Sequence, residues 1–251
     1  MKVDQTIERC RELIAEPLGA IAERWKESHP GGRAVACFPV WSPAEVIHAG
    51  GMLPLGLLGG GATVELTHAD SRFQSFVCSI AKSSLELGFQ GLLKGVDALV
   101  FSNICDVARN LSSIYKRNFP HFHVDYLHLA QNSTSAGVTD YMAEELRRLA
   151  RGFEEAFGVR VTDASLAKSV ELYNAIRARI RDLYAFRIAE PQKLSTVELY
   201  QILRAATQSA PEETLSRLDE LLAELPAREG RPKDRIRVVV EGAFCEQPPL
   251  G

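Results

Sequence analysis

Two of the five cysteines stand where a thiolate could bind a metal. Cys78 comes at the start of a helical pattern, and Cys105 follows the apolar stretch VDALVFS and a short polar turn. Sites in α/β proteins form beyond the strand ends, where irregular backbone can present a side chain toward a cleft. Thiolates select zinc and iron–sulfur clusters over hard cations. The two residues are no CxxC pair, however, so their spacing alone is more typical of small buried apolar side chains.

Strand and helix signals alternate around these cysteines. An amphipathic pattern predicts one helix from Val3 to Lys26. Short apolar runs predict strands at residues 34–40, 52–58, 96–102 and 122–129. Helices are expected between them at residues 42–50, with Ser42 as N-cap and Pro43 at the first position, at 75–93 and at 106–116. This order is typical of an α/β fold with a parallel sheet.

Helical signals without an intervening strand follow from Thr139. Capping residues predict helices that begin at Asp163, Thr196 and Pro211. The stretch IRVVV from Ile236 then resembles the first strand of another α/β unit, which the chain begins and does not complete. We therefore expect four parts: an N-terminal helix (1–30), a first α/β domain with the cysteines (31–135), a helical segment (136–230) and the start of a second α/β domain (231–251).

Composition narrows the function classes. The chain has 251 residues, 46% of them hydrophobic, and a net charge of −3, which indicates a globular protein without the basic patch of a nucleic-acid or membrane binder. No stretch has the length and apolarity of a bilayer span or a signal peptide, so we expect a cytoplasmic protein with reduced thiols. Cys10 and Cys37 are expected in the core. No phosphate loop of the GxGxxG or GxxxxGK[ST] type is present, so nothing indicates nucleotide binding by this chain.

Four stretches resemble one protein family. They are CFPVWSPAEVIHAGGMLPLGLLGGG from Cys37, FQSFVCSIAKSSLELG around Cys78, SNICDVARNLS around Cys105, and EGAFCEQPPLG at the end. The family is that of the iron–sulfur subunits of benzoyl-CoA reductase and 2-hydroxyacyl-CoA dehydratase. The resemblance runs in order from about Cys10 to Gly251. Its last stretch favours the benzoyl-CoA reductase branch, and within it one of the two subunits (B or C type) that hold substrate and cluster.

The resemblance implies a fold and a cofactor. Such subunits have two flavodoxin-like α/β domains, and three cysteines bind a [4Fe–4S] cluster at the cleft between them. Cys78 and Cys105 match the first two ligands. The third is expected in a region of the second domain that this chain does not contain; Cys245 is a local candidate, better explained as a residue that lines the cleft.

It also implies an activity and partners. The implied reaction is low-potential electron transfer to an aromatic acyl-CoA thioester, giving the cyclohexadiene-carbonyl-CoA. The electron would come from ferredoxin through an ATPase that activates it, so that ATP is used by a partner and not by this chain. A homologous iron–sulfur subunit would complete a heterodimer.

Other side chains have both a functional and a structural interpretation. His48, at the end of a short predicted helix, could donate a proton into a cleft, but a structural histidine is favoured. Arg109, one helical turn after Cys105, could orient the cluster surroundings or a CoA phosphate, whereas the neighbouring Asp106 equally fits a helix cap. Lys82, one helical turn after Cys78, could raise the potential of the cluster or contact a CoA phosphate, but a surface lysine is the default. A metal site is not expected at the alternating histidines, which lack a carboxylate or cysteine partner: His121, His123 and His128.

Three alternatives stay open from the sequence. A 2-hydroxyacyl-CoA dehydratase subunit would use the same cluster to eliminate water. A non-catalytic fragment or assembly subunit would fold around its first domain without the third ligand. An ordinary α/β ligand-binding domain would carry the cysteines incidentally.

Overall fold

The computed structural model describes residues 2–39, 41–61, 64–231 and 236. Its internal contacts form two compact units, one of residues 17–169 and the other of residues 1–16 and 170–251. The expected division into four parts stays a prediction. Of the expected start of a second α/β domain (231–251), only Arg231 and Ile236 are described, and Cys245 lies outside the described residues.

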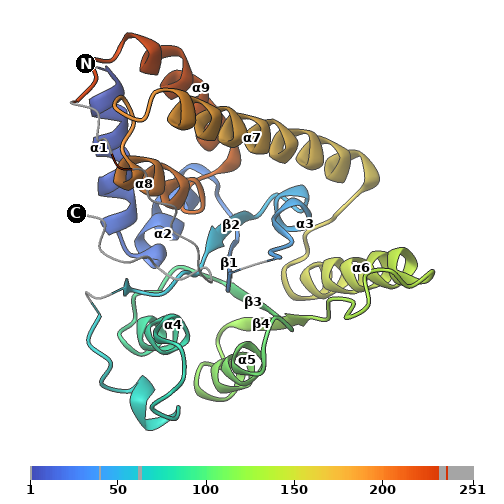
Figure 1. Ribbon diagram of the computed structural model, residues 1–251. Coiled ribbons are helices and arrows are strands. Elements are labelled where there is room, and N and C mark those ends of the chain that lie inside the picture. The colour runs from blue at the N-terminus through green and yellow to red at the C-terminus, as the bar shows by residue number, and fades with distance from the viewer. Residues whose placement is uncertain (1, 40, 62–63, 232–235, 237–251) are drawn as a thin grey trace. The chain divides into compact units, whose positions relative to one another are not determined.

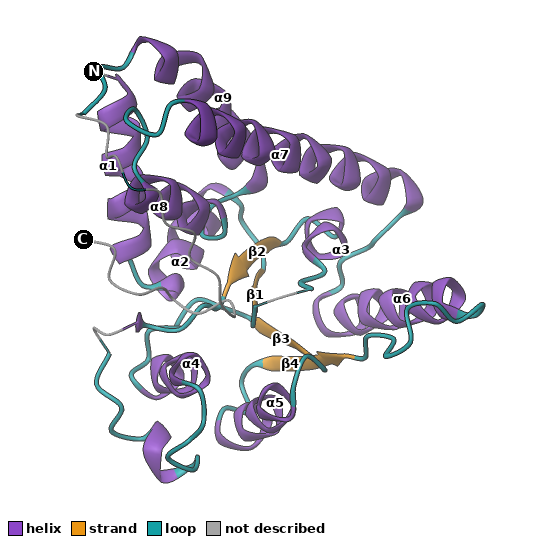
Figure 2. Ribbon diagram, viewed as in Figure 1, coloured by secondary structure: helices purple, strands orange, loops and turns teal. Residues whose placement is uncertain are grey.

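A four-stranded parallel sheet forms the centre of the unit 17–169 (Figure 2). Its strands, in the spatial order β2-β1-β3-β4, are β1 (Ala34–Cys37), β2 (Leu53–Gly56), β3 (Ala98–Ser102) and β4 (His123–Leu127). The register pairs Ala36 with Leu55 and Val100 with Asp125. Every residue of β1 and β3 is buried, as expected for parallel strands covered on both faces. The strand order is that of a flavodoxin-like sheet, so the predicted α/β class is confirmed.

Helices cover both faces of this sheet (Figure 1). One face packs into a core that includes Ile47 of α3 (Ala44–Ala49) and Phe153 of α6 (Val138–Phe157). The other face is covered by α4 (Ser79–Phe89) and α5 (Asp106–Asn118), whose Tyr115 ring packs 5.6 Å from the ring of Phe101 in β3. The unit also contains α2 (Leu18–Ser28) and the 3₁₀ turn η2 (Ala69–Ser71).

The other unit is helical over its described residues. It contains α1 (Lys2–Ala15), most of α7 (Asp163–Ala189), α8 (Thr196–Ala206), α9 (Pro211–Glu224) and the 3₁₀ turn η3 (Leu225–Ala227). The expected starts at Asp163, Thr196 and Pro211 are all confirmed, and Ser195 and Glu198 form a reciprocal capping box. A buried cluster joins these helices through Ile7, Cys10, Ile176, Leu199, Ile202 and Leu218.

Three helix boundaries differ from the sequence-based expectation. The single helix predicted at 3–26 is two helices, because Pro17 has extended backbone (ψ 139°) and supplies no N–H to continue the first. Pro43, not Ser42, is the N-cap of α3. The helix predicted at 75–93 is shorter, because Cys78 has extended backbone (ψ 136°) and Gly91 takes a left-handed conformation (φ +72°).

Across the described residues, no helix combines the length and the apolar character that a bilayer crossing needs.

Candidate functional site

The carboxyl ends of β1 and β3 form a switch point in the sheet. From β1 the chain passes through α3 to β2 on one side, and from β2 it crosses through α4 to β3 on the other side. Loops that leave such neighbouring strands in opposite directions open a crevice, which is where open parallel sheets bind their ligands. The turn from β3 into α5, which ends at Cys105, lies at this point.

Cys105 is the N-cap of α5 and is exposed. Its backbone is extended (φ −163°, ψ 168°), and its Sγ accepts a hydrogen bond from the backbone N–H of Ala108 at 3.4 Å. The sulfur thus takes the place that a serine or aspartate oxygen takes in an ordinary cap. The buried face of α5 begins with Ala108 and includes Leu111, which leaves the cap itself at the solvent edge.

Cys78 occupies the equivalent position on the neighbouring helix. It is the N-cap of α4, it is exposed, and its side chain makes no capping hydrogen bond. Its carbonyl oxygen accepts from the backbone N–H groups of Ala81 and Lys82 at 3.1 and 3.3 Å. Both cysteines therefore stand at the first residue before a helix, each with its thiol accessible.

Helices α4 and α5 lie side by side on the same face of the sheet (Figure 1). The phenol of Tyr115 in α5 donates a hydrogen bond to the carbonyl oxygen of Ser84 in α4. Gly88 favours this close approach, because a Cβ there would stand 3.0 Å from the Tyr115 ring and would push it aside by a few tenths of an ångström. Each helix connects two parallel strands, so both begin at the carboxyl edge of the sheet. Cys78 and Cys105 consequently belong to the same edge.

The thiols of Cys78 and Cys105 are the type of ligand that an iron–sulfur cluster takes, but two thiols are fewer than a cluster needs. Two accessible thiols at neighbouring helix starts match the thiolate ligands that such clusters take. Within the described part of the chain, no three His, Cys, Asp or Glu side chains come together as a metal-binding group. Further ligands would have to come from elsewhere.

Cys10 and Cys37 are buried, as expected. Burial raises the pKa of both thiols, that of Cys37 to about 12, despite a hydrogen bond to Ser42. They are therefore poor candidates for thiolate ligands.

The structure does not place His48 near Cys105. Its Nδ1 lies 2.9 Å from the Oγ of Ser169, and the residues after it, Gly50 and Gly51, lead into the start of β2. His48 is thus at the amino edge of the sheet, whereas the two exposed cysteines belong to the carboxyl edge. Its proposed role as a proton donor at the cysteines gains no support from this placement.

Arg109 lies on the first turn of α5 and is exposed. Among the described residues its guanidinium group makes no hydrogen bond or ion pair. This arginine is one turn beyond Cys105, which keeps it available for an anionic group at the same edge. Lys82, expected at the surface, is instead buried, with 7% of its surface exposed.

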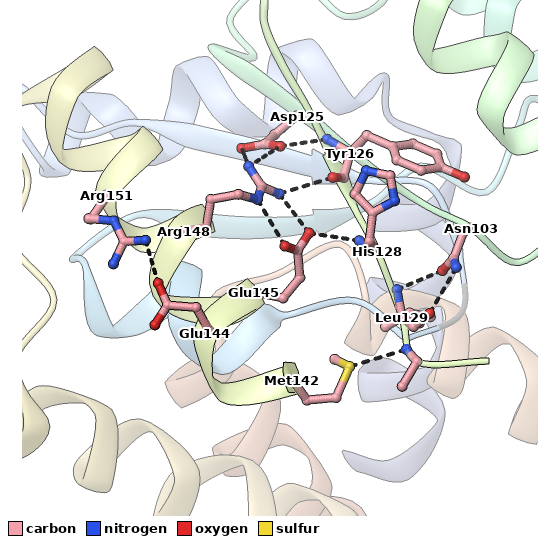
Figure 3. A network of polar contacts seen from close by, with 11 residues as sticks. Asn103, Asp125, Tyr126, His128, Leu129, Met142, Glu144, Glu145, Arg148 and Arg151 are labelled. Carbon is pink, nitrogen blue, oxygen red and sulfur yellow. Dashed lines mark hydrogen bonds and ion pairs between the residues drawn. The ribbon is translucent and has the colours of Figure 1, made fainter. Parts of the chain in front are cut away.

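Asn103 is a site-forming residue that sequence reasoning missed. Its side-chain amide donates to the carbonyl oxygen of Leu129 at 2.9 Å and accepts from the N–H of the same residue at 2.7 Å (Figure 3). The pair extends the contact between β3 and β4 past the last ladder residue. It fixes the turn two residues before Cys105. An asparagine directly after a buried strand was the available signal.

An ion-pair network holds the segment after β4 in place (Figure 3). Arg148 of α6 contacts Asp125 at 3.0 Å and Glu145 at 3.0 Å, and it donates to the carbonyl oxygen of Tyr126. Glu145 also accepts from the backbone N–H of His128 at 2.8 Å. Burial raises the pKa of Glu145, but these hydrogen bonds outweigh it and hold that pKa below its usual value. The imidazole of His128 remains exposed at the carboxyl end of β4.

The comparisons with known proteins agree on one family. The chain is 38% identical over its whole length to the C-type subunit of benzoyl-CoA reductase from Thauera aromatica. It is 28% identical over 98% of its length to the beta subunit of lactoyl-CoA dehydratase from Anaerotignum propionicum, and 27% over 99% to the beta subunit of (R)-2-hydroxyglutaryl-CoA dehydratase from Acidaminococcus fermentans. It spans 64–65% of the length of these relatives. The model of the family described as 2-hydroxyglutaryl-CoA dehydratase, D-component, matches residues 39–250, and the chain belongs to this family.

Proposed function

We propose that this chain is part of an iron–sulfur subunit of an ATP-dependent benzoyl-CoA reductase. The observation that carries the proposal is its 38% identity to the C-type subunit of a benzoyl-CoA reductase, against 22–28% to the beta subunits of three dehydratases over nearly the same residues. The reaction would be the transfer of two electrons at low potential to an aromatic acyl-CoA thioester, which takes up two protons to give the cyclohexadiene-carbonyl-CoA.

Cys78 and Cys105 would hold the [4Fe–4S] cluster. Their exposure and their positions at neighbouring helix starts support this assignment. When bound, the cluster would supply electrons at low potential. The chain itself would present the two sulfurs from the starts of α4 and α5 at the carboxyl edge of the sheet. The remaining ligands would come from Cys245 or from a region outside this chain. Arg109 would offer its charge to a phosphate of CoA.

The energy for the electron would come from a partner. The sequence contains no phosphate loop of the usual forms, which supports ATP hydrolysis on a separate activating protein. That protein would receive its electrons from ferredoxin. The relative with 38% identity is itself named as one subunit of a larger enzyme. A homologous iron–sulfur subunit is the expected direct partner.

Iron analysis tests the cluster assignment. The chain would be co-expressed with its presumed partner subunits and purified anaerobically, and iron, acid-labile sulfide and the EPR spectrum of the dithionite-reduced protein would be measured. We expect about four iron atoms for each copy of this chain, as one [4Fe–4S] cluster requires. Cys78→Ser and Cys105→Ser should each lower that iron content strongly. Cys10→Ser is the matched control, because Cys10 is buried in the other unit. A wild-type complex without iron would refute the assignment.

A dehydratase subunit is the second candidate function. The family model carries a dehydratase description, and three relatives are beta subunits of dehydratases. Product analysis with the assembled enzyme separates the two: benzoyl-CoA should be reduced, and a 2-hydroxyacyl-CoA should be left unchanged. Formation of an unsaturated acyl-CoA from the second substrate would favour the dehydratase.

A further inference from the structure

The connection between β2 and α4 is long and has little regular structure. Between Leu57 and Cys78 the described residues contain no α-helix or β-strand, and the 3₁₀ turn η2 lies within the stretch. Such a segment has no ladder of backbone hydrogen bonds to hold it, so its position depends on side chains. Its last residue is Cys78, whose location therefore depends on how the segment is anchored.

Glu86 anchors the beginning of η2. This carboxylate is fully buried on α4 and accepts three hydrogen bonds, from the backbone N–H groups of His68 and Ala69 and from the His68 ring, each at 2.8 Å. Burial raises the pKa of Glu86, but the three donors outweigh it and lower that pKa overall. A buried carboxylate with this set of donors stays charged and holds two backbone groups at once.

Lys82 anchors the rest of the segment. Its ammonium group lies 2.8 Å from a carboxylate oxygen of Asp70 and donates to the carbonyl oxygen of Ser75 at 3.3 Å. Only 9% of the Lys82 side chain is exposed, whereas 56% of the Asp70 side chain is exposed, so a buried ammonium group meets a carboxylate at the surface. Lys82 and Glu86 are four residues apart and share one face of α4. That face holds the segment at both ends.

Phe89, one turn further on, adds ring contacts to the same segment. The His68 ring stacks on it at 5.3 Å, and the Arg72 guanidinium lies 4.3 Å from its centroid. Charge, hydrogen bonding and stacking thus all fasten residues 68–75 to the helix that Cys78 begins.

We propose that Lys82 and Glu86 are positioning residues for Cys78, which they hold by fastening residues 68–75 to α4. The inference rests on the proposed function, in which Cys78 is a cluster ligand. Residues that orient a metal ligand typically change metal affinity by roughly 10–100-fold when they are replaced.

The test uses the chain in complex with its partner subunits. Glu86→Gln removes the charge, and Lys82→Met removes the ammonium group at similar length; Lys82→Arg is the rescue variant. Glu144→Gln on α6, where Glu144 forms an exposed ion pair with Arg151, is the matched control. The measurements are hydrogen exchange of residues 66–78, the rate of cluster loss to an iron chelator, and the EPR spectrum of the reduced cluster.

We expect exchange in residues 66–78 and cluster loss each to rise about tenfold in Glu86→Gln and Lys82→Met, with a changed EPR spectrum. Lys82→Arg should restore the wild-type values, and Glu144→Gln should not differ from wild type. Wild-type exchange in both variants would overturn the inference. Faster exchange with unchanged cluster loss and an unchanged spectrum would overturn it too, because the segment would then be fastened without any effect on Cys78.

Hydrogen exchange needs no cluster, which separates the two hypotheses. A wild-type complex without iron refutes the proposed function, while the exchange of residues 66–78 still decides whether Lys82 and Glu86 hold the segment.

Discussion

Tyr115 of α5 donates a buried hydrogen bond of 2.5 Å to the carbonyl oxygen of Ser84 in α4. The bond joins the two helices whose N-caps are Cys105 and Cys78. Burial raises the pKa of Tyr115, so the phenol remains a neutral donor across the physiological range. The distance between the two helix starts therefore depends in part on this contact.

Replacement of Tyr115 by Phe should lower stability by about 1 kcal/mol, since the ring packing remains and one hydrogen bond is lost. The corresponding fall in melting temperature is roughly 2–4 °C. Tyr115→Ala should cost about 3–5 kcal/mol, because a cavity replaces the ring. Thermal unfolding followed by circular dichroism measures both, with the exposed Tyr141→Phe as control. Equal costs for Phe and Ala would mean that the hydrogen bond, and not the ring, dominates.

The amide of Asn103 should prove specific. Asn103→Ala loses both hydrogen bonds to Leu129 and should destabilise the unit by about 1–3 kcal/mol. Asn103→Asp should be no better, because a carboxylate oxygen would then face the Leu129 carbonyl. Both should also lower iron content in the complex, since Cys105 lies two residues on. Asn118→Ala, at the exposed end of α5, should change neither quantity. Full iron content in Asn103→Ala would show that the contact between Asn103 and Leu129 does not control the position of Cys105.

The four described cysteines should fall into two reactivity classes. Iodoacetamide should label Cys78 and Cys105 in the native apo chain, because both are exposed. Cys10 and Cys37 should react only after unfolding, because burial raises their pKa. Mass spectrometry of the labelled peptides reads each site separately. Rapid native labelling of Cys37 would contradict its buried position.

Glu198 should make the helical unit sensitive to acid. Burial raises its pKa, but hydrogen bonds from Arg228 and Ser195 outweigh it and lower the pKa to about 2. A carboxyl group whose pKa is lower in the folded state stabilises fully above its unfolded value of 4.5, and this stability is lost as the pH falls toward 2. Glu198→Gln should remove about 2–3 kcal/mol at pH 7 and flatten the pH dependence between 4.5 and 2.

Urea unfolding at several pH values measures that dependence. Glu8→Gln is the matched control, because Glu8 forms an exposed pair with Arg11 in the same unit. An acid profile of Glu198→Gln that parallels the wild type would show that Arg228 does not hold the carboxylate as the geometry indicates.

Sequence patterns located the sheet because its strands are short and because β1 and β3 are apolar and buried along their whole length. They pointed to the two exposed cysteines because each one stands directly before a helix. They failed at Pro17, where a hydrophobic period continued across a residue that cannot continue a helix. The edge of the sheet at which His48 lies could not be predicted, because that needs the order of the strands and no local sequence pattern contains it.

Lys82 and Glu86 show a different limit. A charged residue is expected at the surface unless it has a partner, and their partners lie in an irregular segment whose path no periodicity predicts. Asn103 is similar, since its partner Leu129 follows a different strand. Burial of these polar groups became evident only from tertiary contacts.

The contacts of Lys82 and Glu86 with residues 68–75 join residues that are near in the sequence, whereas Asn103 contacts Leu129, which is farther along the chain and follows another strand. This difference affects the order in which the contacts form during folding. The hydrogen bonds, ion pair and ring contacts described above for residues 68–75 all lie within residues 68–89. Loops of this size close early and quickly, so the surroundings of Cys78 can form as soon as α4 has been synthesised. Cys105 depends on Leu129, which follows β4 and must wait for the sheet edge to pair. The sulfur of Cys78 should therefore be fixed first, and a newly made chain would hold one ordered thiol before it holds two.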